Sequence, residues 1–195
     1  SIISKEAVKN KVNIVVAIGG DGTLNECMKS LVNTETALGV IPCGSGNGFA
    51  NHIGMKPNIK EAIKQIKYSN IISIDSCTIN NLPFLNIAGI GFDAHIAKLF
   101  SKSKKRGFLK YLQLILKELM YDPQEYNISY NNNKQKFNAY MISIANASEY
   151  GNNIKIAPMA NIQDGLLNFV IVKKFPKWEI PFFLYKAYQG KTYLS

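Results

Sequence analysis

The sequence predicts an α/β fold in two parts: an α/β domain with a parallel sheet over residues 1–70, and a mostly antiparallel, β-rich domain over residues 71–195. The first part is indicated by the apolar runs 12–18 and 37–41, since each leads into a glycine-rich turn and a helix, the βα pattern of a parallel sheet. The second part is indicated by the alternation of polar and apolar residues that begins near position 71.

Each element follows from a local pattern. Residues 23–31 and 59–67 predict helices because apolar side chains recur there every three or four positions, and Asn58 is a suitable N-cap for the second helix. In the second part, the asparagines at 131–133 predict a turn between two strands of a hairpin. The remaining predictions are strand-like segments at 72–75, 82–89, 126–130, 136–146 and 166–172, helices at 92–100 and 108–120, and a last amphipathic segment from Pro176.

The first glycine-rich turn places a carboxylate at the start of a helix. Its sequence is Gly-Gly-Asp-Gly-Thr-x-Asn-Glu, over Gly19–Glu26. The N–H groups of such a turn favour anions, so an acidic group fits beside phosphate only with a metal ion or a proton between them. No Gly-Lys-Ser/Thr follows to make a Walker loop, and Asn25 stands where a dinucleotide fingerprint needs glycine. A plain alternative is a tight turn in which Asp21 is the N-cap.

A second glycine-rich turn follows the next strand. Pro42 ends the strand, and the segment Pro-Cys-Gly-Ser-Gly-Asn-Gly then runs to Gly48. Its glycines allow a ligand to approach the backbone, while Ser45 and Asn47 offer short polar side chains. Two such turns at the carboxyl ends of neighbouring parallel strands form the usual ligand crevice of an open α/β sheet.

Together the two turns resemble the catalytic domain shared by diacylglycerol kinases, sphingosine kinases, ceramide kinases and their bacterial lipid kinase relatives. Residues 86–94, with Gly-Phe-Asp at 91–93, and residues 157–167, with Asp-Gly-Leu at 164–166, carry the same resemblance. It implies an NAD kinase-like two-domain fold: a nucleotide-binding α/β domain and a β-rich domain that binds lipid and metal. It also implies transfer of phosphate from ATP, with Mg²⁺, to a hydroxyl of a membrane lipid such as diacylglycerol or a sphingoid base.

The resemblance assigns expected roles to particular residues. Asp21 is the expected catalytic carboxylate, binding Mg²⁺ through water or accepting the proton of the lipid hydroxyl. The Asp164 carboxylate and the carbonyls of Asn161 and Leu166 are the expected metal ligands, and Asp93 is expected to meet the lipid head group. The expected nucleotide-binding residues are Gly19, Gly20, Asp21, Gly22, Thr23, Asn25, Glu26, Gly44, Ser45, Gly46 and Asn47.

Plainer interpretations stay open for three of these acids. Asp164 precedes glycine, as in many ordinary turns. Asp93 is placed to cap a helix, and Glu26 to complement a helix dipole.

Other functions also stay open. NAD kinases share the Gly-Gly-Asp-Gly turn, although the second turn at Pro42–Asn47 argues against them and against phosphofructokinases. The resemblance further implies an earlier βα unit and a later Asp-Gly-Glu segment that holds the usual proton acceptor. We therefore expect a fragment of a longer kinase or a short paralogue, and a non-catalytic nucleotide- or lipid-binding module is the alternative.

The composition limits which kinds of partner we expect. A formal charge of +10 favours anionic partners, and the absence of an aromatic RNA-binding motif argues against nucleic acid. The basic run at 102–106 precedes an amphipathic helix, which predicts either a solvated loop or a contact with a membrane surface. Three cysteines without metal-ligand spacing suit a reducing cytoplasm. We expect a cytoplasmic protein, peripheral to the inner face of the membrane, that acts on lipid there and forms a possible homodimer.

Overall fold

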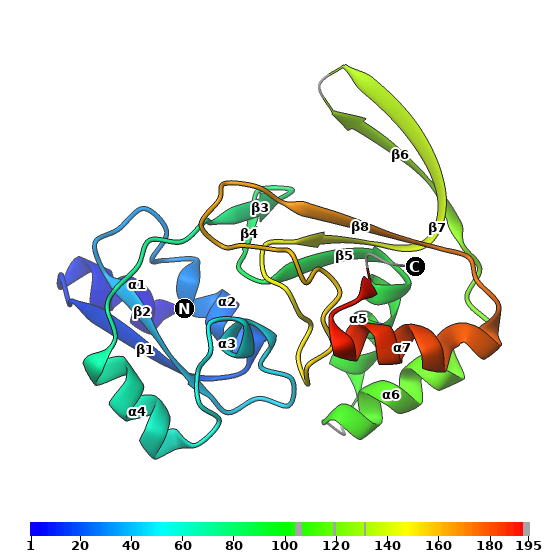
Figure 1. Ribbon diagram of the computed structural model, residues 1–195. Helices are drawn as coiled ribbons and strands as arrows, with labels where there is room; N and C mark the ends of the chain where they lie inside the picture. Colours follow the sequence, from blue (N-terminus) through cyan, green and yellow to red (C-terminus); the bar gives the residue numbers. More distant parts are fainter. Residues whose placement is uncertain (104–106, 119, 131, 193–195) are drawn as a thin grey trace.

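The computed structural model describes residues 1–103, 107–118, 120–130 and 132–192. Its first part is built on two parallel strands, β1 (Ile14–Gly19) and β2 (Ala37–Pro42), which pair in register from Ile14 and Ala37 to Gly19 and Pro42. Because the strands end together, the two glycine-rich turns leave the sheet side by side. Four helices surround this pair (Figure 1): α1 (Ile2–Lys9), α2 (Asp21–Met28), α3 (Gly48–His52) and α4 (Ile59–Tyr68).

A shared core holds the first part together and joins it to the second. Leu24 of α2, Val40 of β2 and Phe49 of α3 are buried in one cluster. Leu85 and Ala147, which lie far along the chain, are buried in the same cluster. At α4 the Asn58 side chain accepts the N–H groups of Lys60 and Glu61, which confirms the predicted N-cap.

The second part is an antiparallel sheet centred on one long strand, β7 (Asn133–Ala145). β7 pairs with β5 (Ile87–Gly91), β6 (Gln124–Tyr130) and β8 (Asn168–Lys173). The β6–β7 hairpin projects away from the body of the molecule (Figure 1). A short hairpin, β3 (Cys77–Ile79) and β4 (Leu82–Phe84), stands between the two sheets.

Three helices cover one face of the antiparallel sheet (Figure 1). They are α5 (Phe92–Lys102), α6 (Phe108–Lys117) and α7 (Ile180–Gln189), the last preceded by a short 3₁₀ turn, η1 (Lys177–Glu179). Among the described residues, none of the helices is both long enough and apolar enough to span a bilayer. The parallel sheet followed by an antiparallel one confirms the predicted fold class, whereas the predicted boundary at residue 70 stays a prediction.

Several predicted boundaries were wrong. Residues 72–75 form no strand, because this segment is fixed by loop contacts instead: the Asp75 N–H donates to the Ile162 carbonyl at 2.7 Å. The predicted strand 82–89 is two strands, β4 and β5, belonging to different sheets. The helix predicted at 23–31 begins at Asp21, two residues earlier than expected, and ends at Met28, three residues earlier than expected.

Candidate functional site

The two glycine-rich turns touch each other through their backbones. A Cβ added to Gly44 would collide with the Cα of Gly20, so this contact requires glycine. The second turn is held in shape by Asn47, which has a φ of 54° and whose side chain accepts the Gly44 N–H at 2.8 Å and donates to the Gly44 carbonyl at 2.9 Å. The predicted crevice at the carboxyl ends of β1 and β2 is therefore formed by backbone packed against backbone.

Asp21 links the first turn to the start of α3. Its two carboxylate oxygens accept the N–H groups of Gly48 at 3.0 Å and Phe49 at 2.9 Å. The N-cap of its own helix is Gly20, so the alternative in which Asp21 caps α2 was wrong. Asp21 instead satisfies two of the N–H groups at the beginning of a different helix. It also lines a pocket, so one carboxylate both holds the turns together and faces a cavity.

The other predicted residues of the first turn separate into two groups. Gly22 has open space around it, and Thr23 is exposed beside Gly19. Asn25 turns inward, where its Oδ1 has no hydrogen-bond partner among the described residues. Glu26 points to solvent and forms an ion pair with Lys29 at 2.5 Å, a contact that lowers the pKa of Glu26. Of this turn, Asp21 lines the cavity, while the nucleotide-binding roles of the other residues stay predictions.

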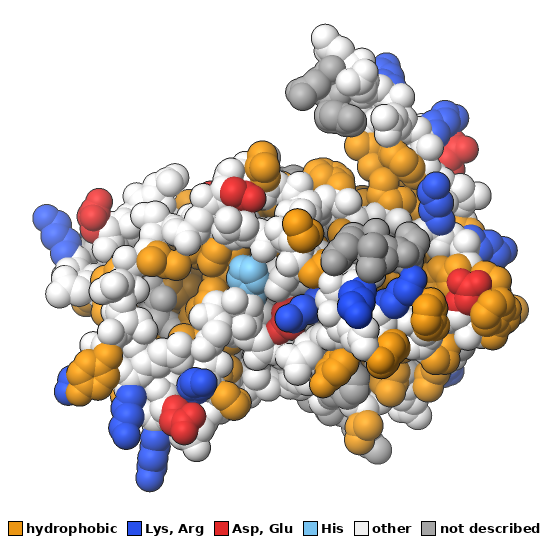
Figure 2. All heavy atoms as spheres, in the orientation of Figure 1, with side chains coloured by type: hydrophobic (Ala, Val, Ile, Leu, Met, Phe, Trp, Pro, Cys, Tyr) orange, Lys and Arg blue, Asp and Glu red, His pale blue; other side chains and the backbone are white. Residues whose placement is uncertain are grey.

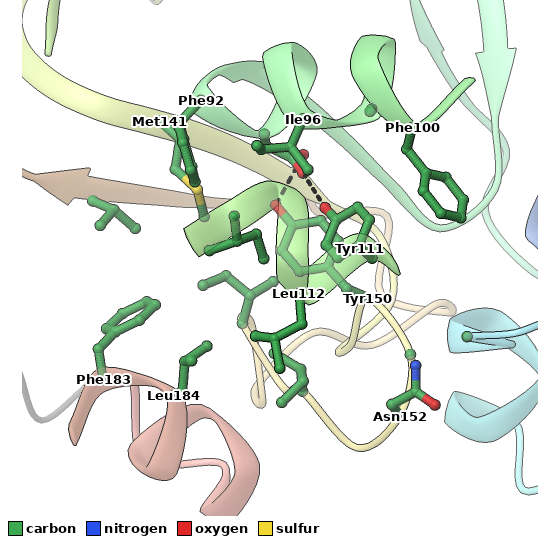
Figure 3. A pocket seen from close by; sticks show the side chains of 18 of the residues that line it. Phe92, Ile96, Phe100, Tyr111, Leu112, Met141, Tyr150, Asn152, Phe183 and Leu184 are labelled. Carbon is green, nitrogen blue, oxygen red and sulfur yellow. Dashed lines mark hydrogen bonds between the residues drawn. The ribbon is translucent and has the colours of Figure 1, made fainter. Parts of the chain in front are cut away.

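A cavity of about 570 Å³ extends from these turns into the second part of the molecule (Figure 3). Asp21, Ser45 and Gly46 line one end of it. Apolar side chains from several elements line the rest: Ile96 and Phe100 of α5, Leu112 of α6, Val172 of β8, and Phe183 and Leu184 of α7. Such a cavity, apolar with a few polar groups, is typical of small-molecule sites. Phe175, which lies between β8 and η1, also contributes to this wall.

Asp93 is the buried acid of the cavity. It accepts hydrogen bonds from the hydroxyls of Tyr150 at 3.1 Å and Tyr111 at 3.4 Å, shown as dashed lines in Figure 3. Burial raises the pKa of Asp93 above its ordinary value, and the two hydroxyl donors lower that pKa in part. A Cβ at Gly89 would collide with the Asp93 carboxylate. Since its carboxylate is held by two tyrosines and the N-cap of α5 is Gly91, the helix-cap interpretation of Asp93 was wrong.

The loop after β7 connects Asp93 with the second glycine-rich turn. Tyr150, which also shares a 2.6 Å hydrogen bond with Ser143, is followed by Gly151, which packs directly against Gly46. The Asn152 N–H then donates to the Gly46 carbonyl at 3.1 Å. Sequence reasoning missed both Tyr111 and Tyr150. Gly151, alone in a polar stretch between a strand and the Asp-Gly turn, was the signal that this loop approaches another backbone closely.

The predicted metal ligands lie in a tight turn. Asp164 accepts the Leu166 N–H at 3.0 Å, and the Asn161 side chain accepts the Gln163 N–H at 3.1 Å. Asp75, which sequence reasoning missed, accepts the Gly165 N–H at 2.8 Å and brings a second carboxylate to the turn. Carboxylate and carbonyl oxygens suit a hard cation in kind. The described residues contain no cluster of three His, Cys, Asp or Glu side chains, so a metal here would depend on backbone carbonyls.

Comparisons with known proteins show the family of this chain. Residues 2–79 match the family described as diacylglycerol kinase catalytic domain, and residues 86–194 match the YegS C-terminal NAD kinase beta sandwich-like domain. The chain is 31% identical over 180 residues to the probable lipid kinase YegS-like protein of Chromohalobacter salexigens. This match covers 89% of this chain and 58% of that protein. It is 33% identical over 176 residues to the probable lipid kinase YegS of Escherichia coli O1:K1, covering 86% and 58%.

A solved structure gives the same result in three dimensions. The crystal structure of a diacylglycerol kinase from Bacillus anthracis superimposes with a TM-score of 0.66 at 27% identity, covering 96% of this chain and 62% of that one. The chain thus spans less than two thirds of the length of the relatives it matches. Two consecutive family matches, the shared fold and the paired glycine-rich turns lead to one conclusion: the chain belongs to the diacylglycerol kinase catalytic domain family, in its YegS-like bacterial lipid kinase branch.

Proposed function

We propose that this protein transfers the γ-phosphoryl group of ATP to a hydroxyl of a membrane lipid, either diacylglycerol or a sphingoid base. The observation that carries the proposal is the shared cavity: Asp21 and Ser45 of the glycine-rich turns line the same space as the buried Asp93 and an apolar wall. A phosphate donor at the turns and a lipid in the cavity would therefore meet. Phosphoryl transfer depends mainly on such positioning.

Each group has a defined task in this proposal. The backbone N–H groups of Gly20, Gly22 and Thr23 hold the phosphates, because the start of α2 favours negative charge. Asp93, oriented by its two tyrosines, accepts a hydrogen bond from the lipid head group. Asp21 uses the lone pairs left by its two N–H donors to hold metal-bound water or to accept the hydroxyl proton. The apolar wall excludes water, which strengthens these polar contacts.

Magnesium fits the proposal at two places. Mg²⁺ would neutralise charge on the nucleotide phosphates near Asp21. A second, structural cation would take the carboxylates of Asp164 and Asp75 and the carbonyls of Asn161 and Leu166, which are oxygen donors of the kind a hard cation prefers. The protein would work at the inner face of the membrane, where its substrate lies.

Transfer of labelled phosphate from ATP tests the proposal. The acceptors are diacylglycerol, sphingosine and ceramide, each dispersed in detergent with Mg²⁺, and NAD is the water-soluble control. Asp93→Asn should abolish labelling of the lipid, whereas Asp122→Asn, which removes the same charge from an exposed loop, should leave it unchanged. Label in NAD alone would replace the lipid kinase with a nucleotide kinase. No label in any acceptor would reject catalysis by this chain and favour a binding module.

A further inference from the structure

Helix α7 is apolar on two opposite faces. Its inner face carries Ile180, Phe183 and Leu184, which line the cavity. Its outer face, extended by Trp178 of the preceding turn, carries Phe182 and Tyr185, and all three side chains are exposed, Trp178 to 78%. The spacing of four and three residues aligns these aromatics along one stripe. A helix that is apolar all round is normally enclosed by other apolar material, so the outer stripe calls for a partner.

Helix α6, on the neighbouring wall of the cavity, also carries both cavity-lining and exposed apolar side chains. Leu112 and Ile115 face the cavity, while Leu109 and Leu116 are exposed along the edge of that face. Figure 2 shows hydrophobic side chains gathered over α7 and α6, with Lys or Arg side chains beside them. We call the exposed set the docking face; it consists of Leu109, Leu116, Trp178, Phe182 and Tyr185.

The chemistry of the docking face fits a lipid bilayer better than a protein. Tryptophan and tyrosine are the side chains that collect at the boundary between lipid and water. Lysines accompany the apolar residues on both helices: Lys110 and Lys117 on α6, and Lys186, whose Nζ lies 4.7 Å from the centre of the Phe182 ring, on α7. Two acids adjoin these helices, since Glu118 is the C-cap of α6 and Glu179 the N-cap of α7.

The net charge argues in the same direction. A chain with a charge of +10 repels a second copy of itself and is attracted by anionic head groups. We propose that the docking face inserts into the head-group region of an anionic bilayer and delivers lipid to the cavity between α6 and α7. This inference rests on the proposed function for the identity of the delivered lipid. The basic run at 102–106, where a membrane contact was one prediction from sequence, lies partly outside the described residues.

The fluorescence of Trp178 tests the insertion directly, because it is the only tryptophan in the sequence. The chain is mixed with vesicles of equal parts phosphatidylglycerol and phosphatidylcholine, the latter brominated on its acyl chains. Bromine quenches tryptophan only at close range, so we expect strong quenching by these vesicles and none by unbrominated ones. Raising the salt from about 0.1 to 1 M should weaken binding, since screening then acts within about 3 Å. Unquenched emission at every vesicle concentration would overturn the proposal.

A pair of variants separates the docking face from general stickiness. Phe182→Ser combined with Tyr185→Ser removes two exposed aromatics without touching the cavity lining, and should lower vesicle affinity on the order of tenfold. Tyr68→Ser is the matched control: Tyr68 is 76% exposed on α4 and has the Lys67 Nζ 5.2 Å from its ring centre, as Phe182 has Lys186. Equal affinity of the double variant and the control would contradict the assignment of the face.

Further readouts distinguish the other possibilities. If Trp178 emission depends on protein concentration without vesicles, a second copy covers the face and the bilayer proposal fails. The double variant should lose phosphate transfer to lipid in vesicles and keep phosphate transfer to lipid in detergent. Loss of transfer in both preparations would mean that α7 acts only through the cavity, which would contradict the proposal. Quenching without any phosphate transfer would retain the docking face and reject the kinase function, so the two failures are distinguishable.

Discussion

Asp21→Asn is the most informative single substitution, because Asp21 is both the expected catalytic carboxylate and the link between the two glycine-rich turns. The carboxylate accepts two backbone N–H groups, at 3.0 Å from Gly48 and 2.9 Å from Phe49. An asparagine has the same shape but only one oxygen. Its amide nitrogen would face one of these donors, so one hydrogen bond is lost and the charge that strengthens the other is removed.

The size of the effect follows from these two contacts. A hydrogen bond to a charged group contributes about 1.5–3 kcal/mol to the free energy of unfolding. For a chain of this length, each kcal/mol changes the melting temperature by about 2–4 °C. Asp21→Asn should therefore lower the Tm by about 3–12 °C, provided that the turns and α3 unfold with the rest of the chain.

The assay combines a thermal melt with phosphate transfer measured well below the lower Tm. Under the proposed function, kcat should fall by much more than the fraction of unfolded protein explains, while Asp122→Asn should match the wild type in both measurements. An unchanged Tm would refute the role of Asp21 as a cap for α3. A normal kcat in fully folded Asp21→Asn would refute its role in catalysis.

Three further predictions use the same measurements. Gly22→Ala should raise the free energy of unfolding by up to about 1 kcal/mol, because a Cβ there meets nothing and alanine favours a helix. The same substitution should weaken ATP binding in a calorimetric titration if phosphate approaches this glycine. Gly48→Ala should instead destabilise the fold by about 1–3 kcal/mol, since its Cβ would lie 2.5 Å from a backbone oxygen. Tyr150→Phe removes a hydrogen-bond donor that lowers the pKa of Asp93, so the pKa of Asp93 should rise. The acidic limb of the pH–activity profile should then move to higher pH. An acidic limb that does not move would exclude ionised Asp93 from the reaction. Burial lowers the pKa of His52 below its ordinary value of about 6.5, so the contribution of His52 to stability is present above that pH and is lost as the pH falls through the folded pKa. In chemical denaturation, the free energy of unfolding should therefore differ less between pH 7 and pH 5 in His52→Gln than in the wild type. An equal difference would assign the acid sensitivity to other groups.

The features that the sequence predicted well are those with a local physical cause. The βα pattern, the N-cap at Asn58 and the two glycine-rich turns each depend on residues within a few positions of one another. The strand at 72–75 failed because no ladder partner is available there, and Asp75 bonds a loop that comes 87 positions later at Ile162. Strand pairing is decided by distant residues, so alternation alone was not sufficient.

The candidate site shows the same division. Sequence alone predicted which short segments would meet phosphate, because glycine, a small polar side chain and a helix start act locally. Only the tertiary structure decided that Asp21 caps α3, that Asp93 is held by Tyr111 and Tyr150, and that Asp75 joins Asp164, since these partners are separated by 18 to 90 positions along the chain. The apolar cavity also arose only when α5, α6, α7 and β8 packed together, because a cavity is the space left between elements and no single element encodes it.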